Sequence, residues 1–164
     1  MFQKTLIALS ALTLISTSLT GCTKAPLAEH SDLQITDGWV RVSEYSVKDG
    51  MTGAFATIAN HTDHDVTLVG GSTEIAMMTE VHEVVMLDGE MKMQPKDGGI
   101  VIEAGKSVTL EPGGLHVMLM GLKQQILEGD EVTITLDFDG AEDQTFTWPA
   151  KASLSGDEEY EPKK

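Results

Sequence analysis

The 164-residue sequence is poor in cysteine, in aromatic residues and in positive charge. Its single cysteine, Cys22, excludes a disulfide framework, a Cys-x-x-Cys redox centre and a zinc site built from thiolates. Eleven Lys and Arg residues stand against 26 Asp and Glu residues, and the formal net charge is -15. A protein that binds nucleic acid by neutralising phosphates is therefore excluded. The residue in excess is methionine, with nine copies.

The amino-terminal segment has the features of an export signal. Lys4 precedes an apolar run, Leu6 to Leu19, that is too short to span a bilayer but has the length of a signal-peptide core. The run ends in Leu19-Thr20-Gly21-Cys22, which resembles the bacterial lipobox, in which cleavage occurs before a lipidated cysteine. This resemblance predicts a lipoprotein signal peptide at 1–21 and a lipid anchor on Cys22 at the periplasmic, extracytoplasmic face of a membrane. An ordinary signal peptide with a chance cysteine is the alternative.

The remaining chain has the composition of one domain with two polar extensions. Residues 22–32 are small and polar and are expected to form a tether. Residues 151–164 carry an acidic run and are expected to form a flexible, solvated tail. This leaves 33–150 as the folded domain.

Inside this domain the hydrophobic pattern has a period of two, and turn residues arrive about every ten residues. No helical pattern of useful length competes. Many short, evenly spaced strands predict an all-β fold, either an immunoglobulin-like Greek-key β-sandwich or a small barrel. The expected strands are Leu33–Ser43, Thr52–Ala59, Asp65–Gly70, Met77–Leu87, Met91–Gln94, Gly99–Glu103, Ser107–Glu111, Leu115–Leu122, Glu131–Phe138 and Gln144–Trp148.

The methionines are concentrated in one part of this domain. Seven of the nine lie between residues 77 and 120, together with two of the five histidines. Methionine in a β core usually fills irregular gaps. In the segment 115–120, however, alternation places Leu115, Val117 and Leu119 on one face of a strand. His116, Met118 and Met120 then share the opposite face, where a filler role is harder to justify.

A second group of such residues is predicted by a hairpin. Asp88-Gly89 is a favoured two-residue turn, which pairs Met86 with Met91 and Val84 with Met93. His82 then lies diagonal to Met93 on the same face, at a Cα separation of about 7–8 Å. This distance lets an imidazole and a long thioether side chain close on one atom.

Two His–Met pairs on separate β segments indicate a soft-metal site. Thioether sulfur is neutral and polarisable, and it suits Cu(I) rather than zinc, calcium or magnesium. Two imidazoles and two thioethers offer four neutral donors to one ion. A blue-copper electron-transfer centre needs a cysteine thiolate in addition, and the one cysteine lies in the lipobox.

The spacing of these residues resembles the signature of the periplasmic Cu(A) chaperones (PCuAC), small cupredoxin-like proteins that carry Cu(I) toward the binuclear copper centre of cytochrome c oxidase. That signature is a His, about ten residues, a Met, about twenty-one residues and a His-x-Met. Here it reads His82, ten residues, Met93, twenty-two residues and His116-Val117-Met118. The resemblance covers about Trp39 to Trp148 and is densest over 82–122.

The resemblance implies a cupredoxin-like sandwich that is not an enzyme and that binds one Cu(I) per chain. It implies His82, Met93, His116 and Met118 as the metal ligands. As a monomer, the protein is expected to pass copper by ligand exchange from a shallow site to cytochrome c oxidase subunit II or to another copper chaperone. A copper storage or tolerance protein and a metal-free surface interaction domain are the alternatives.

The sequence departs from the family pattern in places. One extra residue separates Met93 from His116, and Glu83 follows His82 where many relatives have Met. A shifted register would let Met91 or Met120 replace a named ligand. The tail lacks the His and Met residues with which some relatives hold a second copper. His61 and His64 have donors for a second metal but are expected to lie in a solvated turn.

Overall fold

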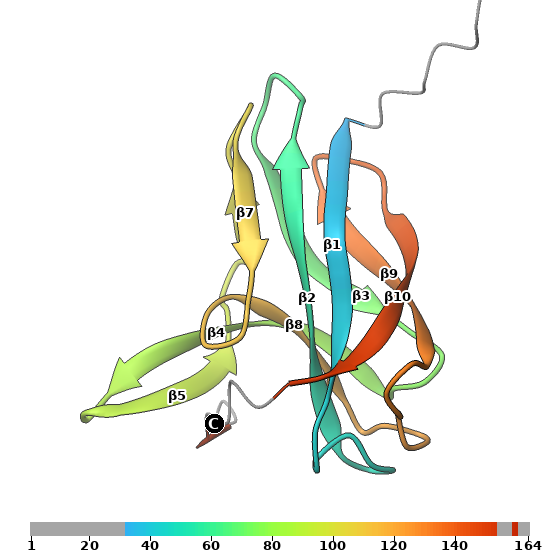
Figure 1. The fold of residues 1–164 in the computed structure, drawn as a ribbon. Coiled ribbons are helices and arrows are strands. Elements are labelled where there is room, and N and C mark those ends of the chain that lie inside the picture. Colours follow the sequence, from blue (N-terminus) through green and yellow to red (C-terminus); the bar gives the residue numbers. More distant parts are fainter. Residues whose placement is uncertain (1–31, 154–158, 161–164) are drawn as a thin grey trace, which may run out of the picture.

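The computed structural model describes residues 32–153 and 159–160, and their regular structure consists of β-strands (Figure 1). In this part of the chain no helix is long and apolar enough to cross a membrane. The strands are β1 (Leu33–Val42), β2 (Met51–Asn60), β3 (Val66–Ser72), β4 (Met78–Leu87), β5 (Glu90–Pro95), β6 (Ile100–Ile102), β7 (Ser107–Leu110), β8 (His116–Met120), β9 (Glu131–Asp139), β10 (Gln144–Ala152) and β11 (Glu159–Tyr160).

The prediction of an all-β fold is confirmed, and each of the ten predicted strands has a counterpart in the structure. The predicted and observed strand bounds differ most at the carboxyl end of the domain. β10 continues past Trp148 to Ala152, because Val40–Val42 of β1 pair in parallel with 150–152. The predicted solvated tail therefore begins too early at Lys151. Within that tail, β11 also pairs in parallel with β5.

The strands form two layers around one core. Along the ladder the order is β11-β5-β4-β8-β2-β1-β10-β9-β3-β6, with β7 on β2. Strands β1, β2, β8, β4 and β5 form one layer, and β10, β9, β3 and β6 form the other. The core between them takes side chains from both layers, such as Ile58 and Leu119 from the first and Leu68 and Ile134 from the second.

Strand β8 is buried on both of its faces. Val117 and Leu119 belong to the main core, and Leu115 packs against it. Met118 and Met120 belong to a separate buried cluster with Met93, against which Met51 and Val84 pack. The predicted division of this strand into a core face and a His/Met face is confirmed.

The predicted hairpin is also confirmed. Asp88 and Gly89 have positive φ angles of 52° and 87°, as the tight turn requires. Met86 is opposite Met91, and Val84 is opposite Met93. In Figure 1 this β4–β5 hairpin projects to the left of the other strands.

The turn between β5 and β6 contains two adjacent glycines whose replacement by alanine should have different costs. Gly98 and Gly99 both have positive φ, at 76° and 77°. A Cβ at Gly98 would meet nothing, whereas a Cβ at Gly99 would collide with the carbonyl oxygen of Leu68 in β3. We therefore expect Gly98→Ala to cost about 1–2 kcal/mol of unfolding free energy from backbone strain alone. Gly99→Ala should cost about 1–3 kcal/mol more because of the collision. Urea unfolding measures both, and equal losses would contradict the described approach of this turn to β3.

Candidate metal centre

The candidate ligands predicted from the sequence come from three strands of one layer. His82 lies on β4, Met93 on β5, and His116 and Met118 on β8. In the β4–β8 ladder His82 is opposite His116, and in the β4–β5 ladder Val84 is opposite Met93. Residues that are paired or two apart share a face, so the four side chains lie on one face of the layer, away from the main core.

The side chains of this face approach one another closely. His116 Nε2 lies 2.9 Å from Met93 Sδ. The ring centres of His82 and His116 are 5.7 Å apart. Met118 belongs to the same buried cluster as Met93. The structure therefore brings the four predicted residues together, although they are spread over 37 positions of the sequence, 82 to 118.

The expectation of a shallow site is wrong, because the four side chains are buried. The exposed fractions are 0% for His82, 4% for His116, 4% for Met93 and 2% for Met118. The reason is that neighbouring apolar side chains, including Met120 and Val84, pack over the same face. A ligand can reach these donors only when a covering side chain moves.

The hydrogen bonds of His116 determine which of its nitrogens can bind a metal. Nδ1 lies 3.0 Å from the carbonyl oxygen of Gly114, which can only accept, so Nδ1 carries the proton and donates it. Nε2 then carries a lone pair and faces the sulfur of Met93, which is also an electron-pair donor. Two electron-pair donors directed at each other are arranged as two ligands of one cation.

In His82 the proton is on the other ring nitrogen. Its Nε2 lies 3.1 Å from Glu80 Oε2, and since an ionised carboxylate can only accept, Nε2 carries the proton. The lone pair is therefore on Nδ1. A carboxylate that holds the far nitrogen of a ligating histidine is a common outer contact of metal sites. Glu80 also lies opposite Met118 in the β4–β8 ladder.

Glu80 was missed by the sequence analysis. The signal was present, because a residue two positions before His82 on a strand must share its face. Its side chain is 34% exposed, so it forms a polar border between the buried imidazole and solvent.

An aromatic group borders the site on the side of β2. The ring centre of Phe55 is 6.1 Å from that of His116, and Trp39 lies against Phe55 at 4.6 Å. The Arg41 guanidinium lies 5.8 Å from the Phe55 ring centre. These groups exclude water from one side of His116.

Burial keeps both imidazoles neutral. The pKa of His116 is lowered to about 4, mainly by burial and to a smaller extent by the nearby charges of His82 and Arg41, against the opposing effect of the Gly114 carbonyl. Burial also lowers the pKa of His82, against the opposing effect of Glu80. At pH 7 both rings are therefore available as neutral ligands.

The other predicted candidates lie apart from these four residues or beside them. Met120 shares their face, while Met91 is 44% exposed near the hairpin tip. His61 Nε2 is 3.2 Å from Gln34 Oε1, and His64 Nε2 is 2.9 Å from the Gly140 carbonyl. No group of three or more His, Cys, Asp or Glu side chains able to hold a metal ion occurs within 32–153 and 159–160. Cys22 lies outside the described residues.

Comparison with known sequences finds a family and relatives. A family model described as "Putative lipoprotein LpqE-like" matches residues 33–150. "Putative lipoprotein Lxx21020" of Leifsonia xyli subsp. xyli is 31% identical over 149 residues, which cover 87% of each chain. "Uncharacterized protein RP573" of Rickettsia prowazekii is 31% identical over 85 residues, 52% of this chain and 47% of that protein.

Comparison with solved structures finds PCuAC domains. The copper-bound PCuAC domain of PmoF2 is 21% identical with a TM-score of 0.61, covering 75% of this chain and 95% of that domain. DR1885 of Deinococcus radiodurans matches in its apo form at 26% identity with a TM-score of 0.56, covering 91% and 97% of the two chains. Its Cu(I) form matches at 27% identity with a TM-score of 0.55, covering 84% of this chain and 86% of that chain. The expected cupredoxin-like fold and the resemblance to PCuAC proteins are confirmed.

The burial of His116 predicts an unusual titration. We expect the His116 pKa near 4, and the His64 pKa above the ordinary 6.5 because the Gly140 carbonyl and Asp63 stabilise its protonated ring. Histidine ¹⁵N NMR from pH 8 to pH 4 would measure both in one sample and would show the proton of His116 on Nδ1. A His116 pKa near 6.5 would contradict the burial.

The same pKa shift predicts how the apo protein responds to acid. Between pH 6.5 and pH 4 the unfolded chain protonates His116 and the folded chain does not, so protons favour unfolding. Acidification over this range should remove up to about 3 kcal/mol of unfolding free energy through this residue. A His116→Asn variant should show a correspondingly shallower loss, and identical pH profiles of the two proteins would contradict the assignment.

Proposed function

The chain belongs to the LpqE-like lipoprotein family, and on this premise we propose that it is an extracytoplasmic Cu(I) chaperone, anchored to a membrane by lipid on Cys22. The observation that carries the proposal is the approach of His116 Nε2 to Met93 Sδ at 2.9 Å in a buried His/Met cluster. The Cu(I) form of DR1885, which this chain resembles at 27% identity, supports copper as the metal.

We assign the copper ligands to His82, Met93, His116 and Met118. All four donors are neutral when the rings are unprotonated, and two are thioethers, so the set favours Cu(I) over zinc. The hydrogen bonds to Gly114 and Glu80 orient the two rings, with His116 presenting Nε2 and His82 presenting Nδ1. This arrangement supports one Cu(I) per chain.

The position of each ligand suggests how copper leaves. His82 lies on β4 and His116 on β8, which are inner strands of the sheet with a neighbour on each side. Each ring is held by a hydrogen bond. Met93 lies on β5, whose outer neighbour is the two-residue strand β11, and its side chain carries no such restraint beyond the contact with His116. Met93 is therefore the ligand that an incoming donor replaces first, when the projecting β4–β5 hairpin bends.

The proposed recipient is another copper protein at the same membrane, either subunit II of cytochrome c oxidase, at its Cu(A) centre, or a further copper chaperone. The described residues offer donors to a soft ion, and the proposal assigns them no catalytic role. Residues 22–32 then act as a tether between the lipid and the copper-binding domain. A lipid anchor confines donor and recipient to a thin layer and raises their effective concentration.

Copper binding tests the ligand assignment. In the full chain with Cys22→Ser, which removes the competing thiol, titration against a chromogenic Cu(I) chelator should give one Cu(I) per chain. Met93→Leu with Met118→Leu should weaken binding by at least about a hundredfold, because two of four donors are lost. The same change should cost less than about 1.5 kcal/mol of unfolding free energy, since the side chains keep nearly the same volume.

The matched control is His61→Ala with His64→Ala, which should leave Cu(I) affinity unchanged. Loss of binding in this control, with binding retained in the Met93/Met118 variant, would overturn the site assignment. A chain that withdraws no copper from the chelator would overturn the chaperone function.

The anchor has its own test. The wild-type chain should fractionate with membranes and dissolve in detergent, because lipidation at Cys22 supplies at least the two acyl chains that stable attachment needs. Cys22→Ser should accumulate as an uncleaved precursor or as a soluble form. Membrane attachment of a cleaved Cys22→Ser protein would contradict lipidation at this residue.

A further inference from the structure

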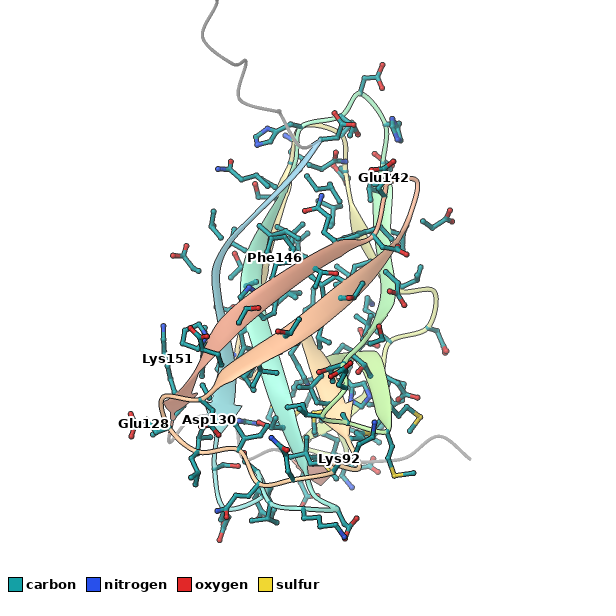
Figure 2. All side chains as sticks on the ribbon, turned by 90° about the vertical axis from the view of Figure 1, so that its right-hand side faces the viewer. Lys92, Glu128, Asp130, Glu142, Phe146 and Lys151 are labelled. Atoms are coloured by element: carbon teal, nitrogen blue, oxygen red, sulfur yellow. The ribbon has the colours of Figure 1, made fainter. Side chains whose placement is uncertain are left out.

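Four methionines near the site are exposed, and neither a core role nor the proposed copper site explains them. The exposed fractions are 77% for Met77, 49% for Met78, 65% for Met86 and 44% for Met91. Methionine as a gap filler belongs inside a core, so these exposed side chains need another explanation. Figure 2 shows the yellow sulfur atoms in the lower half of the view, the same half as Lys92 of β5.

One of these methionines belongs to a row that crosses three adjacent strands. Met51 of β2 is opposite Met120 of β8, and Met120 is opposite Met78 of β4. Paired residues share a face of the layer, and Met120 is two positions from Met118, so this face is that of the proposed copper ligands. We call Met51, Met120 and Met78 the methionine row.

The geometry of the row lets three thioethers meet. Side chains directly opposite each other on paired strands have Cβ atoms about 4.5–5.5 Å apart, and methionine has three rotatable side-chain bonds. Met120 at the centre is 6% exposed and belongs to the buried cluster, while Met51 packs against that cluster. Met78 is half exposed, so the row is open to solvent at one end.

The position of the row relates it to the buried ligands. The β2 position opposite Met118 is Gly53, and the ring of Phe55, also on β2, occupies the place where its Cβ would lie, so Gly53 itself contributes no side chain between Met118 and the row. The order along β8 is then His116, Met118 and Met120 on one face, from the buried imidazole to the row. Residues two apart on a strand are about 7 Å apart, so Met118 and Met120 are neighbours on one continuous path of sulfur atoms.

We propose that Met51, Met120 and Met78 form a second Cu(I) site, made of thioethers alone, through which copper reaches the buried site. The role as an entry site depends on the proposed function, whereas the existence of the site does not. Copper moves inward when the bond to Met120 is replaced by a bond to Met118 and then by bonds to the imidazoles. Only metal–ligand bonds change, copper stays Cu(I), and no proton is released because thioethers carry none.

The existence of the site is tested without the two buried thioether ligands. The probe is Ag(I), a redox-inert ion with the same preference for sulfur, added to the full chain with Cys22→Ser, Met93→Leu and Met118→Leu and with ¹³C-labelled methionine methyl groups. The methyl signals of Met51, Met78 and Met120 should shift together and saturate at one Ag(I). Signals of the row that do not move, or that move no more than those of Met86 and Met91, would overturn the site.

The role is tested by kinetics in the full chain with Cys22→Ser and with the buried ligands intact. Met51→Leu with Met78→Leu should slow loading from a Cu(I)–chelator complex by about tenfold, the lower end of the effect that loss of an outer contact has on a metal site. The affinity of the buried site should stay the same. The matched control, Met86→Leu with Met91→Leu, removes two exposed thioethers outside the row and should load at the wild-type rate.

The outcomes separate this proposal from the proposed function. Equal loading rates in the row variant and the control, with copper still bound, would overturn the entry role and leave the chaperone function intact. Failure of the parent Cys22→Ser chain to bind Cu(I) at its buried residues would overturn the chaperone function and, with it, the entry role. The Ag(I) result would then decide on the thioether site by itself.

Discussion

Strand β8 pairs with β2 on one side and with β4 on the other, and the register of these two ladders determines where the candidate ligands lie. This register places His116 opposite His82, and it divides the strand into a face of Val117 and Leu119 and a face of His116, Met118 and Met120. Because side chains alternate strictly along a strand, a slip of one residue would move the whole His/Met face into the main core. Hydrophobic burial on the first face therefore fixes the position of the donors on the second.

This division lets one short strand serve stability and chemistry separately. Residues of the main core keep the two layers together, and the cluster of Met93, Met118 and Met120 is distinct from it. Burial lowers the pKa of both imidazoles. Their hydrogen bonds to Gly114 and Glu80 offset part of the free-energy cost of desolvating the rings. The result is a neutral, oriented and dry set of donors, which suits a soft monovalent ion.

The features that could be predicted from the sequence are those that depend on residues close together in the chain. Alternation identified the strands and the two faces of 115–120, and the Asp88-Gly89 turn fixed the partners Met86–Met91 and Val84–Met93. The pairing of His82 with His116 could not be predicted in this way, because it depends on the register between β4 and β8, which no turn connects directly. Burial of the donors and the extension of β10 to Ala152 likewise follow from which strands become neighbours, whereas the contact of Glu80 with His82 lies within β4 and follows from alternation.

In the proposed site the buried imidazoles and thioethers together form the first coordination shell of one Cu(I). X-ray absorption at the copper K-edge, measured on the Cys22→Ser chain loaded with one Cu(I), identifies the atoms of this shell. We expect an edge typical of Cu(I) and a first shell with nitrogen and sulfur scatterers in equal number, from His82, His116, Met93 and Met118. A shell of nitrogen and oxygen alone, or of sulfur alone, would contradict this ligand assignment.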